Sequence, residues 1–114
     1  MWDGIRRTFD DQKLDALVTP TIPMPTLPVD MLSVDLTGSG ETALSAFLHH
    51  TFLANVAGIP ALTVPCGFSD ESLPIGLQLY GRPFGEPTIF RIGHAYESAT
   101  DWHLRRPEVG RVAA

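Results

Sequence analysis

Few residues of this sequence could act as nucleophiles or bases, and none stands in a catalytic context. No Gly-x-Ser-x-Gly turn is present, although this is the setting in which many serine nucleophiles occur. Ser39, between Gly38 and Gly40, is the only serine in a glycine-rich stretch, and we interpret it as part of a loop and a helix start. Lys13 is the only lysine. Because no nucleophile is paired with a base, we predict no catalytic residue in this chain.

The histidines and the single cysteine do not form a metal-binding pattern. His49 and His50 are neighbours, so on a helix their side chains would point roughly 100° apart. His94 and His103 lie far along the sequence, and no His-Glu-x-x-His spacing occurs. Cys66 stands in an apolar run, which favours a buried, inert thiol. It is the only cysteine, so no intrachain disulfide can form. We predict no metal and, without a P-loop or a Gly-x-Gly-x-x-Gly motif, no cofactor.

Composition indicates one globular domain over residues 1–114. Apolar residues make up 44% and charged residues 18% of the sequence, as in ordinary globular domains. The net charge of -5 argues against direct binding of nucleic acid. The most apolar stretch, residues 56–68, is broken by Pro60 and Pro65, so we expect no membrane span, and residues 1–4 do not resemble an export signal. A single cysteine fits the reducing cytoplasm best.

The first forty residues predict a helix, a strand and a long loop. Apolar residues fall at helical spacing between Trp2 and Lys13. Residues 15–19 form a short apolar run that ends at Pro20, as expected of a buried strand. Pro20 and three further prolines disfavour regular structure, so we expect residues 20–40 to form a surface loop, and a loop of this length is usually functional or a packing arm.

The remaining sequence predicts a β-hairpin flanked by helices. Residues 39–58 predict a helix with Ser39 as its cap and Gly58 as its end. Residues 61–67 and 75–81 are apolar, β-like runs separated by a polar turn, and Gln78 is the exception in the second run. A last helix should run from Pro87 to about Trp102.

Three long segments together resemble the end of the amidase-signature family. Residues 9–21 are similar to its segment with Asp-x-Leu-x-Thr-Pro-Thr, and residues 51–68 to Thr-x-x-x-Asn-x-x-Gly-x-Pro-Ala-x-x-Val-Pro-Cys-Gly. Residues 73–83 and Glu86 complete the family's order and spacing. The likeness therefore covers about residues 9–107.

The resemblance implies an α/β fold, namely the C-terminal part of an α/β/α sandwich with a mixed sheet that contains the hairpin of residues 61–81. It also implies an amide hydrolase or amidotransferase in which one serine attacks the amide, and a second serine on a cis peptide relays its proton to a lysine. In the family these groups lie upstream of the region present here. The chain would therefore be inactive alone and would need the missing N-terminal part of the same enzyme as its partner.

The same resemblance places walls of the substrate cavity at the end of the helix that carries Thr51 and Asn55. These two residues lie one turn apart on one face, with Phe52 beside them and His50 adjoining. We therefore expect Thr51, Asn55, Phe52 and His50 to contact a small amide substrate in the complete protein. The alternative is that this face only packs against the missing part of the fold.

Two departures from the family bear on function. Leu53 stands where many members have proline. Leu48 stands where the tRNA-dependent, glutamine-using members tend to carry an aspartate that holds an amino-acid substrate. An apolar residue there suits a less polar amide.

We thus expect an amidase acting on carbon-nitrogen bonds, with two alternatives. One is the A subunit of a Glu-tRNA(Gln) or Asp-tRNA(Asn) amidotransferase, and the other is a non-catalytic module that forms a homo-oligomer.

Overall fold

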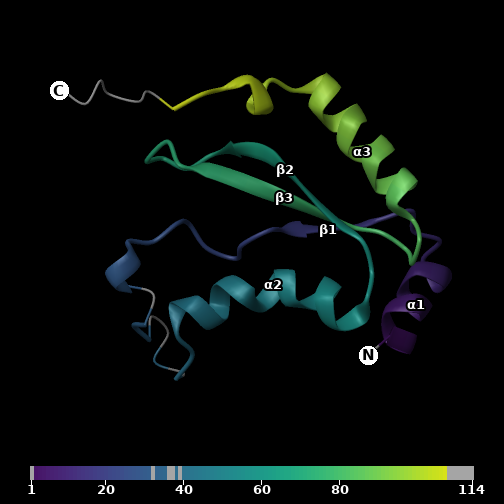
Figure 1. Cartoon of the computed structure of the whole chain (residues 1–114), viewed down its shortest axis with the longest axis horizontal. Helices are drawn as coiled ribbons and strands as arrows, with labels where there is room; N and C mark the ends of the chain where they lie inside the picture. Colours follow the sequence, from purple (N-terminus) through teal and green to yellow (C-terminus); the bar gives the residue numbers. More distant parts are fainter. Residues whose placement is uncertain (1, 32, 36–37, 39, 108–114) are drawn as a thin grey trace.

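The computed structural model describes residues 2–31, 33–35, 38 and 40–107 (Figure 1). Along the chain its helices and strands are α1 (Trp2–Asp11), β1 (Leu17–Pro20), the 3-10 turn η1 (Val29–Met31), α2 (Ala43–Ala57), β2 (Ala61–Phe68), β3 (Pro74–Tyr80), α3 (Glu86–Ala99) and the 3-10 turn η2 (Trp102–Leu104). The predicted order of helix, strand, loop, helix, hairpin and helix is confirmed.

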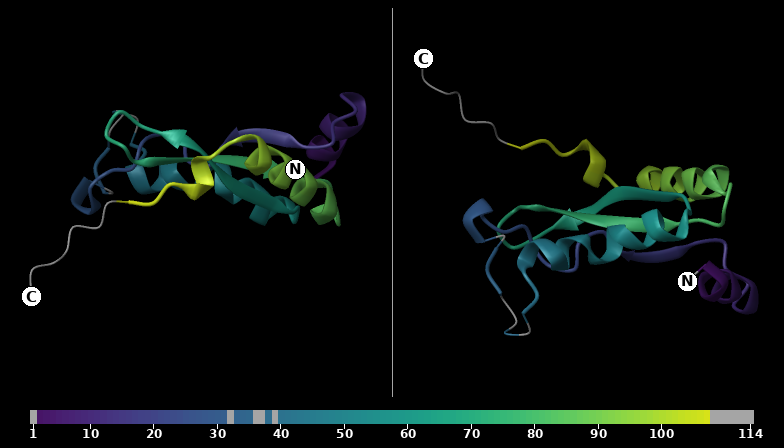
Figure 2. Two further views of the ribbon diagram at one scale, coloured as in Figure 1. Left: turned by 90° about the horizontal axis from the view of Figure 1, so that it is seen from above. Right: turned by 60° about the horizontal axis from the view of Figure 1, so that its bottom comes forward.

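The strands form one sheet in the order β1-β3-β2, and both pairings are antiparallel. The predicted hairpin is therefore confirmed, and β1 lies against its second strand. Helices α2 and α3 lie on opposite sides of this sheet (Figure 1), and Figure 2 shows the same fold from two other directions. This is the expected α/β arrangement. Because every pairing between the described strands is antiparallel, any parallel strand of a mixed sheet must come from outside them.

On one face, α3 packs closely against the hairpin. Leu79 and Val64 of the sheet and Ile89 of α3 are all buried. Gly93 lies where α3 crosses β2, and a Cβ atom there would stand 2.6 Å from Cδ2 of Leu62. The missing side chain therefore lets the helix approach the sheet.

On the other face, α2 is joined to the sheet by apolar packing and by two hydrogen bonds. Ala54 and Ile59 form a buried cluster with Tyr80. The Tyr80 hydroxyl donates to the backbone carbonyl of His50. Nδ1 of the same histidine lies 2.7 Å from the carbonyl oxygen of Pro20, so its N–H is the donor there. The His50 residue therefore ties α2 to both β1 and β3.

The ends of α2 follow familiar capping rules, with one correction. Thr42 is the N-cap, and its side-chain oxygen accepts from the backbone N–H of Ser45 at 3.3 Å. Ser39, which we expected to cap this helix, lies outside the described residues, and the helix begins later than predicted because Thr42 supplies the cap. Gly58 ends the helix as predicted, at a φ of 64° that favours glycine.

Other boundaries shift by a few residues. Strand β1 runs one residue further than expected, since Pro20 still pairs with Leu77. Helix α3 ends at Ala99, and Trp102 belongs to the separate turn η2. Within the expected loop of residues 20–40, η1 is the only helical turn among the described positions.

The Arg82 side chain fastens α1 to the end of β3. Nη1 lies 2.6 Å from Oδ1 of Asp10, and Nη2 donates to the carbonyl of Phe9 at 2.8 Å. Nε donates to the carbonyl of Leu14 at 3.3 Å, and the guanidinium lies 5.2 Å from the centre of the Phe9 ring. The Asp10 carboxylate is about half exposed, so it is a surface charge that pairs with an arginine distant in sequence.

Candidate functional site

The four residues predicted to contact substrate lie on two sides of α2. His50 faces the sheet and is bound to Pro20. Asn55 and Phe52 are exposed, and 59% of the surface of Phe52 is accessible to solvent. The Thr51 hydroxyl donates to the carbonyl of Leu48 within the helix at 3.2 Å. The structure therefore brings Phe52 and Asn55 to one outer surface and separates His50 from them.

An apolar stripe runs along the outside of α2. We call it the outer stripe, and its members repeat every four residues and stay between 46% and 59% exposed: Leu44, Leu48, Phe52 and Val56. The opposite side of the same helix is packed on the sheet through Ala54. A helix that is apolar on both sides is normally buried inside a larger structure.

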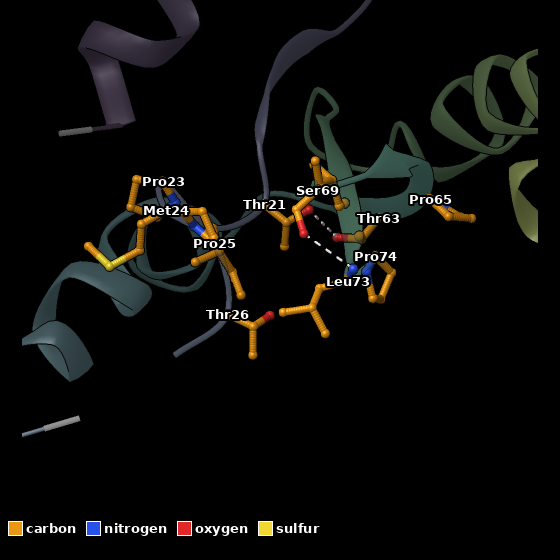
Figure 3. A pocket seen from close by; sticks show the side chains of 13 residues that line it. Thr21, Pro23, Met24, Pro25, Thr26, Thr63, Pro65, Ser69, Leu73 and Pro74 are labelled. Atoms are coloured by element: carbon orange, nitrogen blue, oxygen red, sulfur yellow. Dashed lines mark hydrogen bonds between the residues drawn. The ribbon is translucent and has the colours of Figure 1, made fainter. Parts of the chain in front are cut away.

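A groove of about 550 Å³ lies between the hairpin and the loop that leaves β1 (Figure 3). Its walls come from both segments and are mostly apolar: Thr21, Ile22, Pro23, Met24, Pro25, Thr26, Thr63, Pro65, Ser69, Leu73, Pro74, Ile75 and Gly76. The Thr21 hydroxyl donates to that of Thr63 at 3.3 Å, and Ser69 accepts from the N–H of Leu73 at 3.2 Å. No lining residue is charged, so the groove can hold apolar groups but has no acid or base.

Sequence reasoning did not identify this groove. The only signal was the unusual length of the proline-rich loop after Pro20, which we associated with function or packing. Gly76 makes the close approach feasible, because a Cβ atom there would lie 2.7 Å from Oγ1 of Thr21.

The other chemically suggestive residues are dispersed. Nδ1 of His49 lies 3.1 Å from Oε1 of Glu41 at the surface, and Cys66 is a half-buried free thiol. Within the described residues, no three histidine, cysteine, aspartate or glutamate side chains gather as metal ligands. In the same part of the chain, no helix has the length and apolar character needed to cross a bilayer.

Comparison with known proteins shows the family of this chain. A family model described as Amidase matches residues 1–90. The chain belongs to the amidase family. The resemblance to this family is therefore confirmed.

Named relatives of this amidase-family chain are much longer than the chain itself. It is 47% identical over 112 residues to the A subunit of the glutamyl-tRNA(Gln) amidotransferase of Chloroflexus aggregans, and this covers 95% of the chain but 21% of that protein. The chain is also similar to the crystal structure of the A subunit of the glutamyl-tRNA(Gln) amidotransferase of Thermotoga maritima, with 34% sequence identity and a TM-score of 0.65. This match covers 87% of the chain and 20% of the Thermotoga protein. The structure of a 6-aminohexanoate cyclic dimer hydrolase matches with 27% sequence identity and a TM-score of 0.74, over 92% of the chain and 23% of the hydrolase. The chain thus spans about a fifth of these proteins.

Proposed function

We propose that this chain is the C-terminal part of an enzyme that hydrolyses carboxylic amides to acid and ammonia. The observation that carries the proposal is the match to the amidase family by a chain that has no nucleophile paired with a base. The bond-breaking groups would then lie in polypeptide ahead of residue 1. By the family's pattern these are a nucleophilic serine, a second serine on a cis peptide, and a lysine. Residues 1–114 alone would be inactive.

The contribution of this part is a wall for the substrate and a surface for the rest of the enzyme. The relatives are about five times as long as the chain, so they contain enough polypeptide to cover the outer stripe of α2. Asn55 and Phe52 lie on the exposed side of this helix, and we propose that they border the substrate with Thr51 next to them. His50 would act indirectly, by holding α2 on the sheet.

The substrate proposed here is an amide with an apolar acyl group. Leu48 belongs to the outer stripe, at the position where the resemblance expects an aspartate in glutamine-using enzymes. A leucine offers no acceptor for a substrate ammonium group, so a charged amino-acid amide would lose its partner there.

The A subunit of a tRNA-dependent amidotransferase is the second candidate. The names of the relatives favour it, since similar chains from Chloroflexus aggregans and Moorella thermoacetica both carry that name at 47% and 43% identity. This function would use glutamine and require other subunits. We place either enzyme in the cytoplasm, on the grounds that a lone cysteine suits a reducing compartment.

Ammonia release by the complete protein separates the two candidates. We expect hydrolysis of simple aliphatic and aromatic amides and little release from glutamine. The Leu48→Asp variant should lower kcat/KM for apolar amides by about tenfold or more, because it places a carboxylate against an apolar group. Ser98→Asp adds the same charge at an exposed position of α3 and should change kcat/KM little. Efficient glutamine hydrolysis by the unaltered protein, with poor turnover of apolar amides, would favour the amidotransferase.

A further inference from the structure

Three polar residues form a row across the otherwise apolar sheet beneath α2. Gln78 of β3 pairs in register with Thr19 of β1 on one side and with Thr63 of β2 on the other. Side chains of paired residues project to the same face, and alternation along β3 puts Gln78 on the face of Tyr80, which contacts α2. Gln78 is only 5% exposed. The carboxamide of Gln78 is thus buried, although the neighbouring residues of β3 are apolar.

Two oxygens of this row are buried without a hydrogen-bond partner among the described residues. They are Oε1 of Gln78 and Oγ1 of Thr19. Paired residues on adjacent strands have Cβ atoms roughly 5 Å apart, so the two side chains are close neighbours. Their oxygens nevertheless do not bond to each other. Buried polar oxygens are rarely left unpaired, so this pair points to a bound group that is shared between the two strands.

The chemistry of the row specifies that group. The Gln78 oxygen can only accept, so the group must donate to it. The Thr19 hydroxyl can donate or accept. Thr63, on the other side of Gln78, already accepts from Thr21. A small group that donates to the Gln78 oxygen and bonds to the Thr19 hydroxyl satisfies both buried oxygens, and a water molecule can do this.

We propose that one ordered water is bound beneath α2 between Oε1 of Gln78 and Oγ1 of Thr19. This water joins β1 to β3 two residues before Thr21, where the chain leaves β1 and turns along the groove. It therefore helps to hold the start of the groove loop, at Thr21, in register with the hairpin. The inference does not depend on the proposed catalytic function.

A crystal structure of the complete protein at a resolution that shows ordered water tests this directly. We expect solvent density within hydrogen-bond distance of both Oε1 of Gln78 and Oγ1 of Thr19. A direct bond between these two side chains would overturn the proposal. So would a backbone or side-chain donor from another part of the protein in the same position.

Thermal unfolding of the complete protein supplies a second test. Gln78→Met and Thr19→Val should each lower the melting temperature by about 2 °C or more, because each leaves the remaining partners of the water short of a bond. The double variant should lose clearly less than the sum of the two single variants. Additive losses would contradict a shared water.

Two control comparisons separate loss of the water from a general effect of substitution. Gln12→Met alters the other glutamine, which is exposed just after α1, and should leave the melting temperature unchanged. If Gln78→Met does not fold, Thr19→Ser is compared with Thr19→Val. The serine keeps the hydroxyl and should retain the water and most of the stability, and equal losses for serine and valine would count against the site.

Discussion

Phe52→Asp in the complete protein is expected to destabilise it by about 3 kcal/mol and to abolish amide hydrolysis. The reason is the outer stripe of α2, which includes Phe52 and which the upstream polypeptide should cover. A carboxylate at that position would be buried without a partner, or would force the two parts of the enzyme apart. Urea unfolding and ammonia release measure the two effects.

The matched control for this variant is Ser98→Asp on α3, which should change stability by no more than about 0.5 kcal/mol. If Phe52→Asp behaved like this control, the outer stripe would be solvated in the complete protein. A change in the oligomeric state without loss of activity would instead indicate that a second copy covers the stripe, as the oligomerising alternative predicts. Sedimentation of both variants distinguishes these outcomes.

Arg82→Met should cost about 2–3 kcal/mol of folding free energy. This side chain binds the carboxylate of Asp10 and the carbonyl oxygens of Phe9 and Leu14. Its loss removes the side-chain donor from the Leu14 carbonyl and leaves the Phe9 carbonyl with only the backbone N–H of Leu14. It also frees the end of α1 from the end of β3. Urea unfolding of the complete protein measures the change, and hydrogen exchange should rise first in α1.

Two further substitutions show whether the stabilisation by Arg82 comes from the geometry of its guanidinium or from its charge. Arg82→Lys keeps the charge but has one donor group in place of the planar fork, so it should recover less than half of the lost stability. Arg91→Met removes an exposed arginine from α3 and should have a small effect. A loss for Arg91→Met as large as that for Arg82→Met would contradict the role assigned to the α1 contacts.

Local signals were sufficient to predict the elements. The hairpin of β2 and β3 followed from two apolar runs around a polar turn, and the end of α2 followed from Gly58 and Pro60, which act on their own backbone. The start of α2 was harder to predict because several residues near it can cap a helix, and Thr42 is the one that does so.

The site was harder to predict because it depends on which distant segments meet. Helical spacing put Thr51, Phe52 and Asn55 close together but did not show which side would face the sheet. His50 lies on the same side of α2 as Ala54, and contact with Pro20 turns it away from the predicted site. The sequence also drew attention to Gln78 as a polar exception, without showing that β1 would bring Thr19 beside it.

Ammonia release by residues 1–114 alone, compared with the complete protein on the same amides, tests the central claim most directly. We predict turnover by the complete protein and none above buffer by the isolated chain, because in our proposal the chain supplies structure and cavity wall while the reacting groups lie upstream. Turnover by the isolated chain that disappears on replacing Ser39 or Lys13 would contradict this account.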